Sequence, residues 1–141
     1  MEHQDKLALI QQISATAPFN RWAGFEVLRA GDGEAELGMN WRAEDMAQYS
    51  GFLHAGLISA LLDTVCGFAA ATVSGRVLAS HIAVSCLAPA VGHRFIAQGK
   101  VVKAGKKQVF TKAELYALGE DNARKLVAIG DTILVPVEES R

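Results

Sequence analysis

One acidic residue stands alone in the most hydrophobic part of the chain. Residues 49–75 contain a single charged side chain before Arg76, that of Asp63. An unpaired carboxylate in a dry interior costs on the order of several kcal/mol. Asp63 therefore either takes hydrogen bonds or an ion pair from its neighbours, or faces a cleft where its charge acts as a base or nucleophile. The residues alone leave both interpretations open.

A second group of candidates lies just before the point where a helix is predicted to begin. Gln48, His54 and several small residues gather there. The first backbone N–H groups of a helix lack intrahelical acceptors, and the helix dipole is positive at that end. Such donors can hold a carbonyl oxygen that gains negative charge. His54 and Asp63 are separated by about 13 Å along a helix axis, so two antiparallel copies would bring them closer than one chain does.

The helix that carries Asp63 has one face of small side chains. Residues spaced by four form a slanting stripe on a helix surface. A stripe of small residues permits close approach by a second helix, a sheet or a ligand, which favours a seam rather than a dry core for Asp63. The stripe contains Ala55, Ser59, Asp63, Gly67 and Ala71, and the bulky residues on the other faces are Leu57, Ile58, Leu61, Leu62, Val65 and Phe68.

The elements that position these residues follow from the hydrophobic periodicity. Residues 5–16 are predicted to form an amphipathic helix, and residues 24–30 and 34–39 a β-hairpin. A polar loop over residues 40–51 leads to the long helix at 53–73, which ends before Gly75. The residues predicted to face the core are Leu9, Ile10 and Ile13 in the first helix and Ala35, Leu37 and Met39 in the second strand.

Four more strands are predicted after the long helix, at residues 76–90, 93–105, 107–119 and 123–137. Short, turn-like connections favour an antiparallel meander of these strands. A long apolar helix needs cover on most sides, so we expect a curved sheet of about six strands wrapped around it. The predicted fold class is α+β, in a single domain over residues 1–141. In the third of these strands, one face is predicted to carry Val109, Thr111, Ala113 and Leu115, and the other Phe110, Lys112, Glu114 and Tyr116.

The composition excludes several classes of protein. A net charge of −1 gives no basic field for nucleic acid. Cys66 and Cys86 have no metal-ligand spacing, so no metal site is expected, and both are predicted to be buried. We expect a cytoplasmic protein because the N-terminus has no signal-peptide pattern. The apolar helix is long enough to span a membrane, but Asp63, His54 and the lack of a second span argue against membrane insertion.

The segment "HAGLISALLD", residues 54–63, resembles the signature of the hotdog-fold acyl-CoA thioesterases of the PaaI-like branch. The similarity extends to Gln48 six positions before the histidine, to the phrase "CLAPA" at residues 86–90 and to a basic turn, "KAGKK", at 103–107. The predicted order of elements is similar along nearly the whole chain. The resemblance implies a hotdog fold and hydrolysis of an acyl-CoA thioester.

The resemblance also implies a site shared by two subunits. Asp63 of one subunit would activate water or attack the thioester carbon. The backbone N–H of Ala55 in the other subunit would hold the oxyanion, and Gln48 would orient the thioester or the water. His54 is expected to fix the loop rather than to take a proton. The implied assembly is a homodimer, with a dimer of dimers as the larger form, and no cofactor is implied.

Further residues are implied to bind the substrate. Lys103, Lys106 and Lys107 would bind the phosphates of coenzyme A, with Arg76 and Gly56 also in contact with substrate; a solvated lysine cluster is the simpler alternative. Two positions depart from the family pattern, because the residue after the histidine is commonly Gly and a Ser or Thr commonly stands where Ala79 is. Trp22, Phe25 and Trp41 are expected in the core or in a pocket wall.

Two other functions stay open at this stage. The first is a non-catalytic hotdog protein that binds an acyl thioester or another hydrophobic ligand, which the residues Ala55 and Ala79 keep possible. The second is a hotdog lyase that acts on acyl thioesters, which would pair an acid with a catalytic histidine in a different arrangement. The sequence does not give the acyl group.

Overall fold

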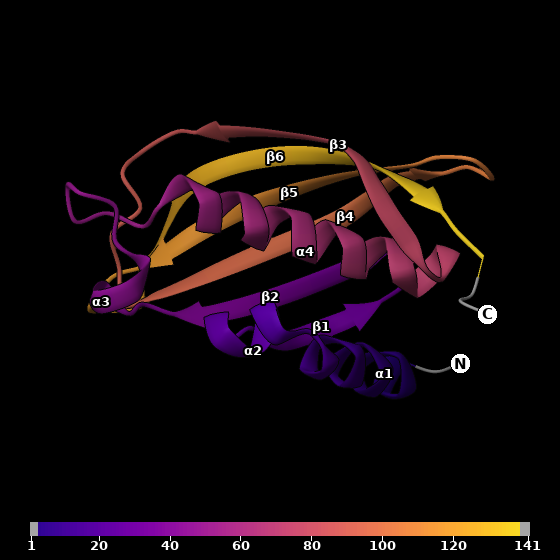
Figure 1. Cartoon of the computed structure of the whole chain (residues 1–141), viewed down its shortest axis with the longest axis horizontal. Coiled ribbons are helices and arrows are strands. Elements are labelled where there is room, and N and C mark those ends of the chain that lie inside the picture. The colour runs from indigo at the N-terminus through magenta and orange to yellow at the C-terminus, as the bar shows by residue number, and fades with distance from the viewer. Residues whose placement is uncertain (1–2, 139–141) are drawn as a thin grey trace.

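The computed structural model describes residues 3–138 (Figure 1). The helices are α1 (His3–Thr16), α2 (Pro18–Ala23), α3 (Ala43–Met46) and α4 (Ala55–Ser74). The strands are β1 (Glu26–Gly31), β2 (Glu34–Asn40), β3 (Val77–Cys86), β4 (Arg94–Ala104), β5 (Val109–Leu118) and β6 (Arg124–Pro136). The sequence predicts all of these elements except α2 and α3, which are too short to show a helical repeat of hydrophobic residues.

The six strands form one antiparallel sheet in the order β1-β2-β4-β5-β6-β3. The hairpin of β1 and β2 and the shared sheet are as predicted. The prediction of a meander over the last four strands is wrong for β3, which pairs with β6 and not with β4. One edge of β4 pairs with β2 and the other with β5, so β3 has no free edge of β4 to join.

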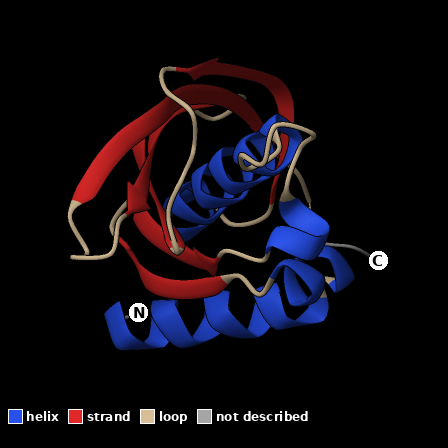
Figure 2. Cartoon of the chain, turned by 90° about the vertical axis from the view of Figure 1, so that its left-hand side faces the viewer, coloured by secondary structure: helices blue, strands red, loops and turns tan. Residues whose placement is uncertain are grey.

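The sheet curls around α4, which lies on its concave side (Figure 2). Gly99 of β4 lies against the helix backbone, since a Cβ atom there would be 2.9 Å from the carbonyl oxygen of Val65. By length and hydropathy α4 would also suit a membrane, but its buried face packs into its own sheet, as the core helices of globular proteins do. Of the two predicted faces of β5, the one with Val109, Thr111, Ala113 and Leu115 is buried.

Helix α1 packs on β1 through a narrower face than the sequence predicts. Ile10 is 3% exposed, but Leu9 and Ile13 are 44% and 46% exposed. Ser14, one turn after Ile10, is also buried, and Gln11 donates from Nε2 to a backbone carbonyl of β1 at 3.1 Å. The prediction that Leu9 and Ile13 face the core is therefore wrong, because a helix against the edge strand of a sheet buries only one stripe.

The two cysteines differ in environment, although the sequence predicts both to be buried. Cys66 of α4 is fully buried. Burial raises the pKa of its thiol, while hydrogen bonds from the hydroxyl groups of Thr111 and Thr132 lower it. Cys86, the last residue of β3, is exposed. β3 is an edge strand with a neighbour on one side only, so fewer of its side chains are covered and the prediction for Cys86 is wrong.

Candidate functional site

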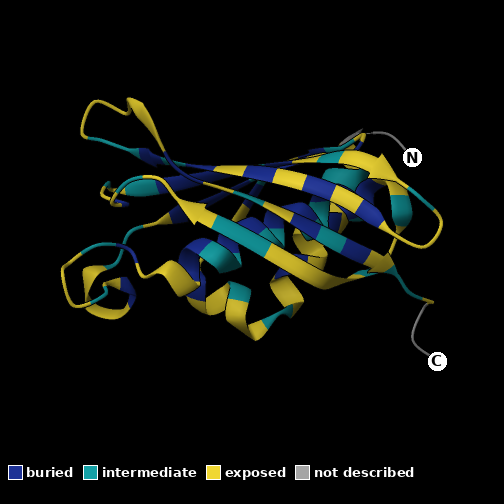
Figure 3. Ribbon diagram, turned by 90° about the horizontal axis from the view of Figure 1, so that it is seen from above, coloured by how far each residue is buried: buried dark blue, intermediate teal, exposed yellow. Residues whose placement is uncertain are grey.

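The stripe of small residues on α4 is the part of the helix that the sheet leaves uncovered. Ser59, Asp63, Gly67 and Ala71 are half-buried, and Ala55 is exposed. In Figure 3 the side of α4 turned away from the sheet is drawn mainly in the colours of exposed and intermediate residues. The bulky residues pack against the strands, with Leu57, Ile58, Leu61, Leu62 and Val65 all buried.

Asp63 is half-buried on this stripe. Within residues 3–138 its carboxylate has no hydrogen-bond or ion-pair partner. Burial raises the pKa of Asp63 because the charged form loses solvation. The simpler interpretation from sequence, a structural carboxylate held by its neighbours, therefore finds no support within the described chain. A half-buried carboxylate with open lone pairs can accept a proton from a water or attack a carbonyl carbon.

The N-terminus of α4 leaves one backbone donor without an acceptor in the described chain. His54 is the N-cap, and its Nδ1 accepts from the backbone N–H of Gly56 at 2.8 Å. The N–H groups of Leu57 and Ile58 donate to the carbonyl oxygen of His54 at 2.9 and 3.1 Å. Only the N–H of Ala55 in this first turn has no acceptor among residues 3–138. Because Ala55 is exposed, this N–H can donate to an external carbonyl oxygen.

The loop before α4 is held by its own backbone. Ala47 and Leu53 form an isolated antiparallel bridge, and the N–H of His54 donates to the carbonyl oxygen of Met46 at 3.0 Å. The Oε1 atom of Gln48 accepts from backbone N–H groups of Ser50 and of residue 52. Its amide oxygen therefore closes the turn, which leaves the Nε2 group of Gln48 as the part that can contact a ligand.

The predicted site residues lie at three levels along α4. Gln48, His54, Ala55 and Gly56 lie together at its N-terminus, and Asp63 lies more than two turns further along. Lys103 lies near the end of β4, and Lys106 and Lys107 lie in the turn between β4 and β5; all three are exposed, at the end of the molecule where α4 finishes (Figure 1). Arg76 lies two residues after the end of α4. One chain therefore brings the first group together but not the whole set.

The backbone of β3 is irregular next to Ala79, the position where the family commonly has a Ser or Thr. The pairing of β3 with β6 shifts between Ala79 and His81, which makes Ser80 the extra residue of a β-bulge. The simple alternation of side chains between the two faces of a strand therefore does not apply between Ala79 and His81. The Oγ atom of Ser80 donates to the carbonyl oxygen of Ile133 at 3.2 Å, so its hydroxyl already has a backbone partner.

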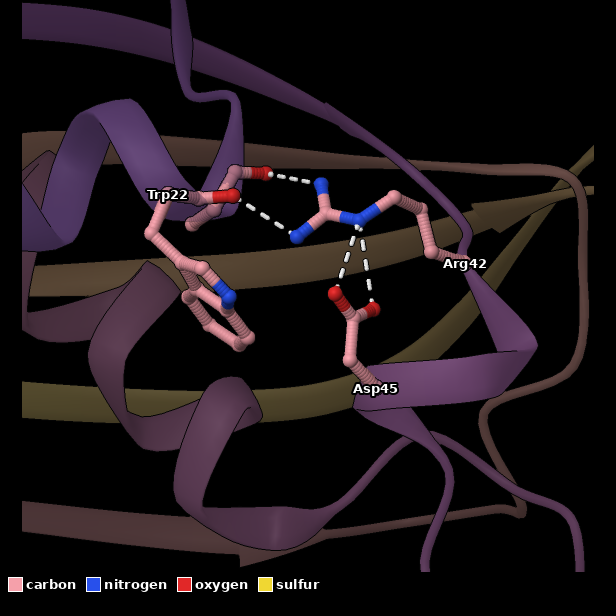
Figure 4. A network of polar contacts seen from close by, with 4 residues as sticks. Trp22, Arg42 and Asp45 are labelled. Carbon is pink, nitrogen blue, oxygen red and sulfur yellow. Dashed lines mark hydrogen bonds and ion pairs between the residues drawn. The ribbon is translucent and has the colours of Figure 1, made fainter.

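One polar network was not found from the sequence. The guanidinium of Arg42 donates to the carbonyl oxygens of Trp22 and Ala23 at 2.7 and 3.3 Å and pairs with Asp45 at 3.2 Å (Figure 4). It also lies 5.2 Å from the centre of the Trp22 ring. Trp22 is 45% exposed, so it is not a core residue. The sequence showed a polar stretch of twelve residues, 40–51, but such a stretch does not indicate which of its side chains form contacts with α2.

Two other features lie away from α4. A hollow of about 570 Å³ on the outer face of the sheet is lined by side chains such as Glu36, Gln98 and Lys112, which point away from the helix because strand residues alternate. Among residues 3–138 no three His, Cys, Asp or Glu side chains lie close enough to hold a metal ion. The absence of a metal from the reaction stays a prediction.

Comparison with known proteins decides the family. The model of the thioesterase superfamily matches residues 50–123, more than half of the chain. The chain belongs to the thioesterase superfamily. The matched thioesterase region begins in the loop before α4 and includes the whole helix with Asp63. Membership in the superfamily supports hydrolysis of a thioester as the class of reaction.

Solved structures agree with this assignment. A thioesterase family protein from Silicibacter pomeroyi is similar with a TM-score of 0.85 and 31% identity, over 89% of this chain and 93% of that one. A mutant of the phenylacetic acid degradation protein PaaI from Thermus thermophilus has a TM-score of 0.76 and 26% identity, over 86% and 100%. A Shewanella oneidensis protein related to the superfamily shares the fold, with a TM-score of 0.78 and 20% identity, over 95% and 97%.

These comparisons confirm the predicted hotdog fold and the resemblance to PaaI-like thioesterases. The sequence matches none of the curated proteins with which it was compared. The roles of the individual site residues stay predictions.

Proposed function

We propose that this thioesterase hydrolyses an acyl-CoA, with Asp63 as general base or nucleophile and the N–H of Ala55 as oxyanion donor. One observation carries the proposal. In the first turn of α4, the N–H groups of residues 56–58 all have acceptors within the chain, and that of Ala55 has none among residues 3–138. A single free N–H at the positive end of a helix is suited to bind the oxygen of a tetrahedral intermediate.

Asp63 and the N–H of Ala55 are sufficient for each step of the hydrolysis. As a general base, Asp63 takes a proton from water while the water oxygen forms a bond to the thioester carbon. The carbonyl oxygen becomes negative and accepts a hydrogen bond from the N–H of Ala55. The C–S bond then breaks, the proton moves from Asp63 to the departing sulfur, and the products are the free acid and CoA. As a nucleophile, the Asp63 carboxylate would form an anhydride with the acyl group as the C–S bond breaks and CoA leaves as a thiolate; water then hydrolyses the anhydride to the free acid and the Asp63 carboxylate, and the released proton is taken up by the thiolate.

The two groups belong to different subunits in this proposal. Within one chain, Ala55 and Asp63 are separated by about 12 Å along α4, which is too far for one reacting carbon. Two copies of α4 that pack antiparallel across the small stripe would place Ala55 of one subunit near Asp63 of the other. In this register Gly67 faces the loop before α4 of the other subunit, and it permits close approach because a Cβ atom added there would meet nothing within 4 Å among residues 3–138 of its own chain. We therefore propose a homodimer as the active form, with a dimer of dimers as the larger assembly.

The remaining residues have supporting roles in this proposal. His54 fixes the start of α4 by its bond to Gly56, and the Nε2 group of Gln48 orients the thioester or the water. The exposed turn at residues 103–107 supplies positive charge for the phosphates of CoA. In the proposed antiparallel dimer, that turn of one subunit lies toward the Ala55 end of the other. We place the protein in the cytoplasm as part of the proposal.

Substitution of Ala55 tests directly whether its backbone N–H is the oxyanion donor. Ala55 is the first helical residue after the N-cap, where proline is well tolerated because its N–H has no helical partner. His54 has φ −61° and ψ 135°, which suits a residue before proline. Ala55→Pro therefore removes one donor and keeps the helix. Ala55→Gly is the matched control because it retains the N–H.

We expect Ala55→Pro to lower kcat by about 10²- to 10³-fold, as loss of an oxyanion donor does. Asp63→Asn should abolish hydrolysis while the dimer persists, whereas Asp5→Asn, an exposed aspartate of α1, should leave it unchanged. The assay is thiol release from a panel of aromatic, short-chain and long-chain acyl-CoAs. Equal turnover of the Pro and Gly variants at Ala55, or turnover unaffected by Asp63→Asn, would contradict the mechanism.

A second candidate function is binding of an acyl thioester without turnover. It is favoured by β3, where Ala79 has no hydroxyl and the hydroxyl of Ser80 already donates to Ile133. Calorimetry combined with the thiol-release assay separates the two functions, since a pure binding protein gives a heat of binding with acyl-CoA and releases no thiol.

A further inference from the structure

Three aromatic rings of the N-terminal region form a connected group with an open side. The ring of Phe19 lies 5.9 Å from that of Phe25 and 5.7 Å from that of Trp22. Phe25 packs against the core, but Phe19 and Trp22 are 46% and 45% exposed. Burial of apolar surface is worth about 25 cal/mol per Å², so the two outer rings offer a favourable contact for an apolar group.

Arg42 holds the outer ring in place (Figure 4). Its guanidinium donates to the carbonyl oxygens of Trp22 and Ala23, which are the last carbonyls of α2 and lack intrahelical donors. The same group pairs with Asp45 of α3 and lies over the indole ring. The backbone of Trp22 and one face of its ring are therefore fixed. A ring fixed beforehand loses little conformational entropy when it binds an apolar group.

A series of contacts links the fixed ring of Trp22 to the proposed oxyanion donor, the N–H of Ala55. Arg42 is the N-cap of α3, a helix of four residues and hence about 6 Å long. The carbonyl oxygen of Met46, at the end of α3, accepts from the N–H of His54, and His54 is followed by Ala55. The rings of α2 are therefore linked to the start of α4 through Arg42, helix α3 and the bond between His54 and Met46. The exposed aromatic side chains in the segments that lead to α4 are Tyr49 of the loop and Phe19 and Trp22 of α2, and of these Trp22 is the one whose ring contacts Arg42.

We propose that Trp22, held by Arg42, is a specificity-determining residue for the acyl group. Aromatic and extended apolar acyl groups pack against its open side, and an acetyl group is too short to reach it. Arg42 acts as a positioning residue, because its contacts are to α2 and α3. This inference rests on the proposed function, since it assumes that the thioester carbonyl is held at Ala55.

Kinetics on a series of acyl groups tests the inference. Trp22→Ala should lower kcat/KM for benzoyl-CoA and decanoyl-CoA at least tenfold more than for acetyl-CoA. Arg42→Lys keeps the charge but loses the paired donors, so it should change the same ratio to a smaller extent. Phe110→Ala is the matched control, because Phe110 is a 38% exposed aromatic on β5, and it should leave the ratio unchanged. An equal loss on all three substrates, or a change of oligomeric state on Trp22→Ala, would overturn the proposal.

A binding measurement separates this inference from the hydrolytic function. The protein has two tryptophans, so Trp41→Phe leaves Trp22 as the only indole reporter. We expect S-decyl-CoA, a thioether that cannot be hydrolysed, to shift Trp22 emission, and S-methyl-CoA to shift it less at equal occupancy. If Trp41→Phe does not fold, the difference between wild type and Trp22→Phe gives the same signal. A shift without hydrolysis refutes only the proposed reaction, whereas hydrolysis with no shift and no change of acyl selectivity refutes only this inference.

Discussion

Gly67 gives the sharpest test of whether a second copy covers α4. It lies on the uncovered stripe one turn after Asp63, and an added Cβ atom would meet nothing within 4 Å among residues 3–138 of the same chain. In an isolated chain, Gly67→Ala should therefore stabilise the helix by about 0.5–1 kcal/mol. For a chain near this size, 1 kcal/mol corresponds to a rise in Tm of roughly 2–4 °C.

The expected result is the opposite if a second copy packs against this stripe in the proposed register, where Gly67 faces the loop before α4 of the other subunit. An extra methyl group in a close-packed contact costs about 1–3 kcal/mol. A cost of about 2 kcal/mol raises the dissociation constant of the dimer roughly 30-fold. We therefore expect Gly67→Ala to weaken the dimer, and Gly67→Leu to weaken it further.

Analytical ultracentrifugation over a range of concentrations measures the dissociation constant, and thermal unfolding measures stability. Gly99→Ala is the contrasting control, because a Cβ atom there would be 2.9 Å from the carbonyl oxygen of Val65 and should destabilise the fold of each subunit. An unchanged dissociation constant for Gly67→Ala together with the full rise in Tm would refute the packing of a second copy at this point.

Two further predictions concern charge. Charge reversal of Lys106 and Lys107 should raise KM for CoA thioesters but not for short pantetheine thioesters, which lack the distal phosphates; equal effects on both would leave the lysine turn without a role in binding. Because burial raises the pKa of Asp63, kcat/KM should fall with decreasing pH at a higher pH than for an ordinary aspartate. The folded state holds the proton of Asp63 more tightly than the unfolded state does, so its ionisation lowers stability as pH rises above about 3.9. Asp63→Asn should accordingly raise Tm at pH 7, and this rise in Tm should vanish below the pKa of an unfolded aspartate. A fall of kcat/KM at acid pH that does not depend on Asp63, or a Tm difference that does not depend on it, would contradict the argument.

The sequence by itself determined the elements that have a strong hydrophobic period. The alternation in residues 34–39 and 109–115 and the apolar run of α4 are local patterns, and the structure has them as predicted. The stripe around Asp63 was also predictable, because a spacing of four residues fixes which side chains share a helix face.

Tertiary structure decided what local patterns do not encode. The partner of β3 depends on which strand edges are already occupied, so pairing with β6 could not follow from short connections alone. The exposure of Leu9, Ile13 and Cys86 depends on how much of each element another element covers. The same holds for Arg42, whose partners Trp22 and Asp45 lie on two different helices.

In the candidate site, too, some features follow from the sequence and others follow only from the tertiary structure. Its residues could be named from their spacing. That the N–H of Ala55 has no acceptor among residues 3–138 could not be predicted, because it depends on where His54 directs its Nδ1 atom and its carbonyl oxygen. The sequence placed Asp63 on a helix, and the fold left it on the one side of that helix that the sheet does not cover. Burial by the surrounding fold, which no local pattern contains, is what raises its pKa.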